Sequence, residues 1–213
     1  IESEFNNALR RIENCAYLVS TGGNGTKVDA QMLKGLEENT TFDAIRFTNA
    51  EGVNLASDGA TSDSSDRDYF IRGMQGENGV TTVEESRLTG KPMMVFYAPV
   101  YDGGEVVGMF LGLYFAEEYL RDMLYASYFG EPADVFLCSQ DGRSIATSDG
   151  RSYKASLLDL LTESGVIDAQ TAQKAQAVFT KGGEAALLCN KGCKTDNLCV
   201  MHLPAYNYTL VQA

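Results

Sequence analysis

A short stretch that begins at Asp66, DRDYFIRGMQGENG, combines arginine, acidic residues and two adjacent aromatics. The guanidinium of Arg67 offers five N–H donors in a planar fork that matches a carboxylate. Tyr69 and Phe70 offer apolar walls, or a ring face for a cation. Together these side chains can hold a small anion or a zwitterion. The alternative is that Arg67 pairs with Asp66 or Asp68 while the aromatics fill the core.

A second group of reactive side chains lies near the C-terminal end, and comprises Cys189, Cys193, Cys199 and His202. If the hairpin around them is symmetric about Lys194, Cys189 and Cys199 face each other and can form a cross-strand disulfide. The rival is a zinc site from all four side chains, at a spacing that standard zinc sites do not use. We favour the disulfide or free thiols and predict no metal site.

No catalytic motif accompanies these residues. The sequence contains no G-x-S-x-G, no P-loop and no H-E-x-x-H. Any Ser-His or Cys-His mechanism would have to use His202, the single histidine. The many carboxylates form no evident acid–base couple. We therefore predict that this segment is not an enzyme and uses no cofactor.

The composition is that of a folded, acidic protein. Hydrophobic residues make up 44% and charged residues 22% of the 213 positions. The formal net charge of −12 repels phosphate backbones, so we predict no nucleic-acid partner. No apolar run approaches the roughly 20 residues that span a bilayer. The sequence opens directly in a helical pattern, without an initiator Met or a signal peptide, and we expect a piece of a longer protein.

Hydrophobic periodicity predicts a long helix at the start of the chain. Apolar residues recur with 4-3-4-3 spacing over residues 5–19, which fits a helix of about five turns. Its apolar stripe packs either on its own domain or in a dimer seam. A short helix over residues 29–39 follows.

Two similar lobes are predicted after these helices. Residues 42–57 and 134–149 each alternate apolar and polar positions about an acid-Gly turn, which is typical of a hairpin. The other expected elements are strands 91–101, 105–115, 184–190, 198–202 and 206–212, and helices 116–129, 155–163 and 168–179. Each lobe is thus an antiparallel sheet flanked by helices, which is an α+β architecture.

The order and spacing of these blocks resemble the double CACHE sensor domain, a tandem of two PAS-like lobes after a long N-terminal helix. The blocks that carry the resemblance are FDAIRFTNAEGVNLASDG, DRDYFIRGMQGENG, TGKPMMVFYAPVYDGGEVVGMFLGLY, DVFLCSQDGRSIATS and LPAYNYTLVQA. The resemblance covers nearly the whole chain. It implies an N-terminal helix over residues 1–25, a membrane-distal lobe over 26–129 and a membrane-proximal lobe over 130–213.

The resemblance also implies a small-molecule site in the distal lobe, beneath a loop that ends in Arg-x-aromatic-aromatic. The candidate ligand-binding residues are Arg67, Asp68, Tyr69, Phe70, Glu84, Ser86 and Tyr114. Amino-acid-binding members hold the ligand's ammonium with two aspartates, whose counterparts here are Ser86 and Tyr114. A buried ammonium without its counter-charge is costly, which disfavours a standard α-amino acid unless Glu84 or Asp68 substitutes. A carboxylate, a neutral polar metabolite or no ligand remain open.

The implied function is that of an extracytoplasmic sensor that binds a small molecule and signals across the membrane. In the full-length protein, transmembrane helices would flank the chain and an output domain would follow. A diguanylate cyclase is the first expectation for that output, from the Gly108-x-x-x-Gly112-Leu-Tyr114 ending, and a histidine kinase or chemoreceptor comes next. Ligand binding would bias a two-state homodimer formed through the N-terminal helix. The alternative is a ligand-free structural module that sets dimer geometry.

Overall fold

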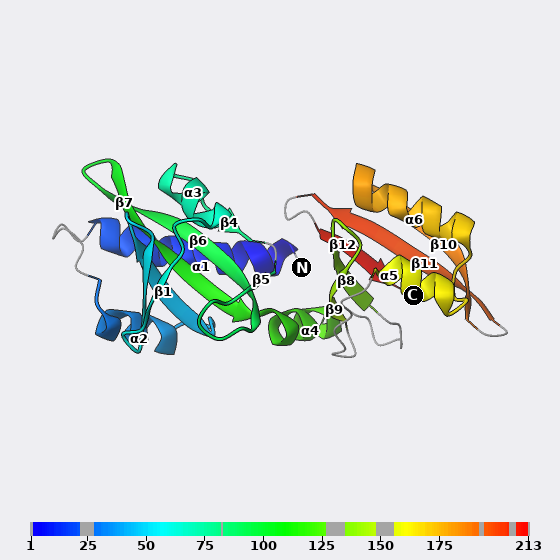
Figure 1. Ribbon diagram of the computed structural model, residues 1–213, viewed down its shortest axis with the longest axis horizontal. Helices are drawn as coiled ribbons and strands as arrows, with labels where there is room; N and C mark the ends of the chain where they lie inside the picture. The colour runs from blue at the N-terminus through cyan, green and yellow to red at the C-terminus, as the bar shows by residue number, and fades with distance from the viewer. Residues whose placement is uncertain are drawn as a thin grey trace. The chain divides into compact units, whose positions relative to one another are not determined.

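The computed structural model describes residues 2–21, 28–81, 83–126, 135–147, 156–191, 194–204 and 208–212. The chain divides into a first unit, Ser3–Phe115, and a second unit, Ala116–Ala213 with Ile1–Glu2. Each unit contains an antiparallel sheet with helices, as Figure 1 shows, which confirms the predicted α+β class. No helix in these ranges combines the length and apolar character needed to span a membrane.

The first unit begins with the predicted long helix, α1 (Glu2–Thr21). Its buried face consists of Phe5, Ala8, Ile12, Cys15, Ala16 and Val19. The ring of Phe5 meets that of Phe96 edge-on, with 5.9 Å between centroids, so the apolar stripe packs on the sheet of its own unit. The next helix, α2 (Ala30–Glu38), begins where Asp29 accepts a hydrogen bond from the Met32 N–H at 2.9 Å.

The sheet of the first unit has the order β3-β2-β1-β7-β6-β4, and β5 pairs with β6. Its strands are β1 (Ala44–Asn49), β2 (Val53–Ala56), β3 (Thr61–Asp63), β4 (Gly79–Val80), β5 (Glu84–Glu85), β6 (Pro92–Asp102) and β7 (Glu105–Phe115). The predicted hairpins β1–β2 and β6–β7 are both present. Because β1 lies between β2 and β7, it is a central strand, and side chains on both of its faces are covered.

The two faces of this sheet carry different residues. One face is aromatic and packs against α1, with Phe42, Phe96 and Tyr114 in ring contact. The other face packs against α3 (Asp68–Met74), and we call it the α3 face. Its core contains Tyr69, Phe70, Met93, Val95, Tyr97, Met109, Leu111 and Leu113.

The helix α3 was not among the elements expected from the sequence, which placed only the end of a loop at residues 67–70. The helix has only seven residues, too few for a periodic pattern to stand out. It forms because Tyr69, Phe70 and Gly73 present one buried face to the sheet. The backbone of Gly73 lies so close to Met109 that a Cβ atom there would overlap the Met109 side chain.

The second unit has the sheet order β10-β11-β12-β8-β9. Its elements are α4 (Ala116–Ala126), β8 (Val135–Ser139), β9 (Ser144–Thr147), α5 (Leu157–Glu163), α6 (Ala169–Lys181), β10 (Glu184–Lys191), β11 (Lys194–Leu203) and β12 (Tyr208–Gln212). The helix α4 contacts β8 and β9 and therefore belongs to this unit. The division between units thus falls after Phe115, not after Phe129 as the sequence analysis expected.

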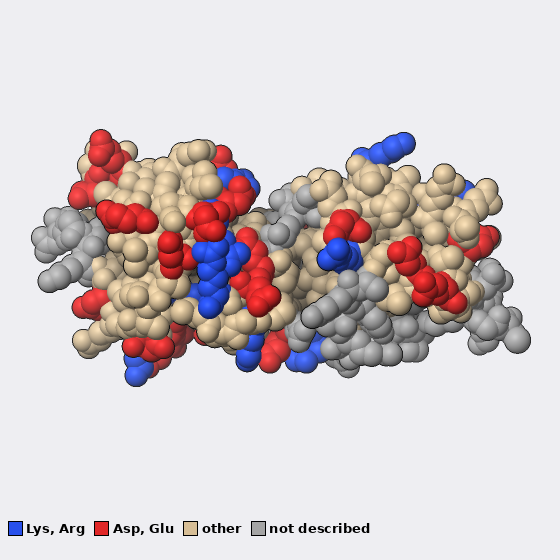
Figure 2. Space-filling view, in the orientation of Figure 1, with Lys and Arg blue, Asp and Glu red and all other residues tan. Residues whose placement is uncertain are grey.

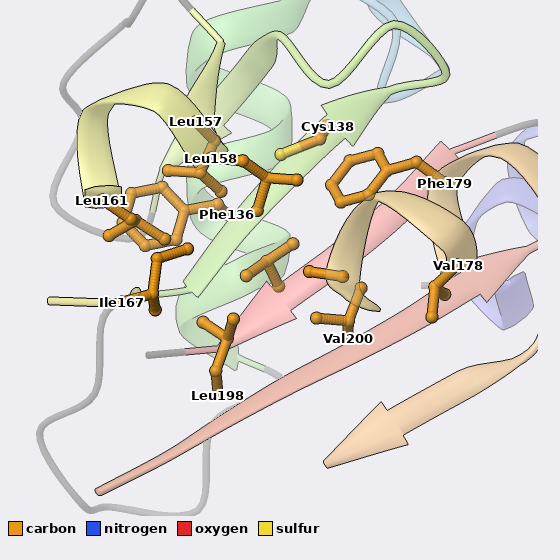
Figure 3. Close-up of a cluster of buried hydrophobic side chains, with 12 residues drawn as sticks. Phe136, Cys138, Leu157, Leu158, Leu161, Ile167, Val178, Phe179, Leu198 and Val200 are labelled. Atoms are coloured by element: carbon orange, nitrogen blue, oxygen red, sulfur yellow. The ribbon is translucent and has the colours of Figure 1, made fainter. Parts of the chain in front are cut away.

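The core of the second unit lies between its sheet and the helices α5 and α6. Figure 3 shows its side chains, which include Phe136, Cys138, Leu157, Leu158, Leu161, Ile167, Val178, Phe179, Leu198 and Val200. Side-chain caps set the starts of both helices. Ser156 accepts a hydrogen bond from the Asp159 N–H, and Asp168 accepts one from the Thr171 N–H at 2.7 Å.

The predicted disulfide between Cys189 and Cys199 is wrong. The register of β10 and β11 pairs Cys189 with Asp196 and Cys199 with Ala186. The hairpin is therefore centred before Lys194, and the two cysteines lie three positions out of register. Cys199 is a free, exposed thiol. The rival zinc site needs Cys193, which lies outside the described residues, and among the residues described no cluster of three or more ligand side chains is present.

The described thiols of Cys15, Cys138 and Cys199 differ in burial, which leads to a testable order of reactivity. Burial raises the pKa of the Cys15 and Cys138 thiols, and the thiolate is the reactive form. We expect iodoacetamide at pH 8 to modify Cys199 in the native protein, and Cys15 and Cys138 only after unfolding. Peptide mass mapping over time measures this order, and Cys199→Ser removes the early product as a control. Native modification of Cys138 as fast as that of Cys199 would contradict the observed burial.

Candidate ligand-binding site

A small polar pocket lies on the α3 face of the first sheet. Its inner part consists of buried or half-buried side chains from β1, β2, β3, the residue after β3, and α3: Arg46, Asn54, Ser62, Ser64 and Tyr69. Its outer part consists of residues 67 and 84–87. The cavity volume is about 20 Å³, which is room for about one water molecule. The pocket therefore has to widen before a metabolite can enter.

Hydrogen bonds connect the neutral side chains of the inner pocket. The Tyr69 hydroxyl donates to Ser64 Oγ at 2.9 Å, and Asn54 Nδ2 donates to Ser62 Oγ at 3.1 Å and also to Ser64 Oγ. Thr48, opposite Asn54 in the strand register, donates to Asn54 Oδ1 and so fixes the orientation of the amide. Burial raises the pKa of the Tyr69 phenol, which remains a neutral donor.

Arg46 is the charged residue of the inner pocket. It lies on the central strand β1, and only 9% of its surface is exposed. Its Nε has no hydrogen-bond partner, and within the described ranges no carboxylate forms an ion pair with its guanidinium. Burial lowers the pKa of Arg46, yet an arginine keeps its charge in proteins. The pocket thus contains a buried cation without a counter-charge.

The sequence analysis missed Arg46, although the alternation of β1 contained a signal. Ile45 and Phe47 occupy one face of the strand, which places Arg46 and Thr48 on the other. In a two-layer hairpin that second face would be solvated. It is covered here because β1 is central and α3 packs over the same face.

Arg67 is bound by neither of the two aspartates that the sequence analysis considered. Its Nη1 forms an ion pair with Glu84 Oε2 at 2.9 Å, and its Nη2 donates to the Glu85 carbonyl at 3.1 Å. Asp66 is instead held by Arg87 through two hydrogen bonds of 2.7 Å. Burial raises the pKa of Glu84 even though Arg67 opposes this effect, so the ion pair only partly offsets the burial of the carboxylate.

The structure brings together four of the seven predicted ligand-binding residues. Arg67, Tyr69, Glu84 and Ser86 all line the pocket. Asp68 is exposed, with 3.9 Å between its Oδ2 and Arg72 Nη1. Figure 2 shows that acidic and basic side chains are interspersed on the visible face of the first unit.

Phe70 and Tyr114 lie away from the pocket. Phe70 belongs to the hydrophobic core of the α3 face. Tyr114 occupies the opposite face of the sheet, where its hydroxyl shares a 2.5 Å hydrogen bond with Thr41 Oγ1 and its ring lies 4.8 Å from that of Phe42. Alternation along β7 causes this, because Leu113 points to the α3 face and its neighbour must point away.

A second, more open groove lies in the second unit, with a volume of about 650 Å³. It is lined by the end of α6 and by β11, and includes Lys181 and His202. The His202 ring lies 3.3 Å from the Thr209 hydroxyl, measured from Nδ1 to Oγ1. None of the described residues that line this groove is a buried charged side chain, in contrast to Arg46 in the first unit.

Comparison with known proteins relates the chain to receptor sensor domains. No protein-family model matches the sequence, and no curated protein matches it. Among solved structures, the extracellular domain of the putative histidine kinase rpHK1S-Z16 matches with a TM-score of 0.69 and 17% identity, over 98% of this chain and 85% of that one. The ligand-binding domain of the Pseudomonas fluorescens chemoreceptor CtaA, in complex with L-serine, matches with a TM-score of 0.69 and 18% identity, over 99% of this chain and 88% of that one.

A third match has a lower score over the same extent. The sensory domain of the Campylobacter jejuni chemoreceptor Tlp3, with isoleucine bound, has a TM-score of 0.60 and 14% identity, over 98% of this chain and 81% of that one. The chain therefore has the fold of extracellular sensor domains of histidine kinases and chemoreceptors. This confirms the predicted likeness to a sensor domain with two PAS-like lobes.

Proposed function

We propose that this chain is the extracytoplasmic sensor domain of a membrane receptor and binds a small molecule in the pocket of its first unit. The observation that carries the proposal is the buried Arg46, which has no counter-charge among the described residues. A buried charge without a partner is costly, and such groups concentrate at functional sites. Structures with the same fold include chemoreceptor domains in complex with L-serine and with isoleucine, which supports a small-molecule ligand.

Ligand entry would separate Arg67 from Glu84. The cavity of about 20 Å³ is smaller than any metabolite, and this ion pair lies in its outer part. The strand β5 that carries Glu84 has two residues and pairs with β6 opposite Met93 and Pro92, and proline has no N–H to donate. A strand this short makes few hydrogen bonds to β6, so its displacement breaks few contacts.

The rest of the proposal concerns the full-length receptor. Transmembrane helices would flank the chain. For the output domain, our first choice is a diguanylate cyclase, and our second choice is a histidine kinase or a chemoreceptor signalling domain. The segment itself would be no enzyme. A homodimer through α1 is supported by Tyr17 and Leu18, two large apolar side chains that the first unit leaves exposed.

A thermal-shift screen of metabolites at millimolar concentration tests ligand binding. A ligand at 100 times its dissociation constant adds about 2.7 kcal/mol to the free energy of unfolding. We expect at least one compound to raise the melting temperature, and Arg67→Ala to reduce that rise because the guanidinium contacts the ligand. Arg143→Ala, an exposed arginine of the second unit, is the matched control and should keep the full shift. A screen in which nothing stabilises the protein favours the ligand-free structural module.

A further inference from the structure

The inner pocket limits the charge that a ligand can carry. We propose that the ligand bears one net negative charge and that Arg46 binds its anionic group, so that neutral amino acids are poor ligands. This inference rests on the proposed function, because it concerns the same pocket. It also separates this chain from the chemoreceptor domains described in complex with L-serine and isoleucine.

When the ion pairs among the pocket residues are counted, one cation remains without a carboxylate partner. Arg67 is neutralised by Glu84 at 2.9 Å, and Arg87 by the two oxygens of Asp66 at 2.7 Å. The Glu85 side chain is exposed, and only its backbone carbonyl takes part, as the acceptor for Arg67. Arg46 remains, so the enclosed part of the pocket carries one positive charge in total.

Two carboxylates, Glu37 and Asp58, act electrostatically on Arg46, but both accept hydrogen bonds from backbone N–H groups. Glu37 Oε1 accepts a hydrogen bond from the Ile45 N–H at 2.7 Å, and Asp58 Oδ1 accepts one from the Ala60 N–H at 2.8 Å. Both raise the pKa of Arg46, but burial lowers it by more. They act from a distance, since neither is within ion-pair range of the guanidinium. None of the described residues supplies the counter-charge of Arg46, and we infer that a ligand does.

The residues around Arg46 suit a carboxylate. A guanidinium binds a carboxylate with two parallel N–H donors. The Ser64 hydroxyl accepts hydrogen bonds from Asn54 and Tyr69 and has its own O–H left to donate to the ligand. A neutral zwitterion brings equal and opposite charges, and so leaves the charge of Arg46 without compensation. A simple monocarboxylate and an acidic amino acid both carry one net negative charge. The ammonium group of an acidic amino acid would pair with Glu84.

Pairs of acids and their amides provide the test, because the two members are nearly equal in shape. Calorimetry on the whole chain would compare L-aspartate with L-asparagine, L-glutamate with L-glutamine, and propanoate and L-lactate with their amides. We expect an acid to bind at least about tenfold more tightly than its amide, since a hydrogen bond to a charged group contributes more than one to a neutral group. Binding of L-aspartate or L-glutamate alone identifies an acidic amino acid, and binding of propanoate or L-lactate a monocarboxylate. Arg46→Gln should remove the preference in either case.

The outcomes separate this inference from the proposed function. If a neutral amino acid or an amide binds as tightly as its acid, the pocket is a sensor site but the charge inference is wrong. If no compound of the panel or of the wider metabolite screen binds, both are contradicted.

A second experiment does not depend on the ligand. Arg46→Met removes the buried charge and keeps the length of the side chain, so we expect the melting temperature without added ligand to rise by at least about 2 °C. Arg10→Met, at an exposed position of α1, is the control and should change it little. A fall in melting temperature for Arg46→Met would show that the protein itself satisfies Arg46, and would overturn the inference.

Discussion

Replacing Phe179 by alanine is expected to lower the free energy of unfolding of the second unit by about 3–5 kcal/mol. The side chain is 0% exposed and belongs to the core between the sheet and α6. Its removal takes apolar surface out of the core and leaves a cavity that the surrounding side chains fill only in part. Denaturant unfolding with linear extrapolation measures the change.

Leu188→Ala is the matched control for this prediction, because Leu188 lies on β10 of the same unit and is 70% exposed. We expect it to change the free energy of unfolding by no more than about 0.5 kcal/mol. Ligand binding in the first unit should survive Phe179→Ala at temperatures where the variant is folded, since the pocket draws on residues of the first unit alone. A loss of less than about 1 kcal/mol for Phe179→Ala would contradict the described core.

Gly112→Ala is expected to destabilise the first unit by about 1–3 kcal/mol through overpacking. A Cβ atom at this position would lie 2.6 Å from two atoms of the Phe42 ring. That ring cannot retreat easily, because its centroid lies 4.8 Å from that of Tyr114 and 6.1 Å from that of Phe96. The glycine of β7 thus provides the space in which the aromatic face of the sheet packs.

A glycine-to-alanine substitution at another position of the first unit should stabilise the protein instead. Gly35 lies within the helix α2, and a Cβ atom there meets nothing within 4 Å. Gly35→Ala should therefore stabilise the protein by about 0.5–1 kcal/mol, through helix propensity alone. Thermal unfolding of the two variants side by side distinguishes packing from propensity. A neutral Gly112→Ala would mean that Phe42 does not occupy the described position.

The long elements of the fold were predictable because each has a local cause. The strands β6 and β7 follow from two apolar runs about the turn at Gly103 and Gly104, which both have positive φ. The helix α6 follows from the Asp168 cap and its apolar period. Short elements such as α3 and β5 depend on contacts with the sheet, and a single sequence contains little local information on those contacts.

The pocket was predictable only in part, for reasons of register and topology. Arg67 and Tyr69 stood out because their side-chain chemistry is recognisable in the sequence. Arg46 did not, because its burial depends on β1 pairing with β7, which is distant in sequence. Tyr114 was misplaced because alternation sends it to the far face of the sheet. The disulfide failed for a related reason, since a shift of the hairpin centre changes every cross-strand partner.

The buried cation lies in a chain whose formal net charge is −12. At long range the electric field of such a chain repels an anion, whereas at short range Arg46 attracts it. Dissolved ions screen the first effect beyond a Debye length of about 8 Å at physiological ionic strength, but hardly reach a contact inside the protein. Added salt would therefore speed the encounter with an anionic ligand without weakening the bound complex. Proteins that attract anions with exposed basic surfaces show the reverse, since salt slows their association.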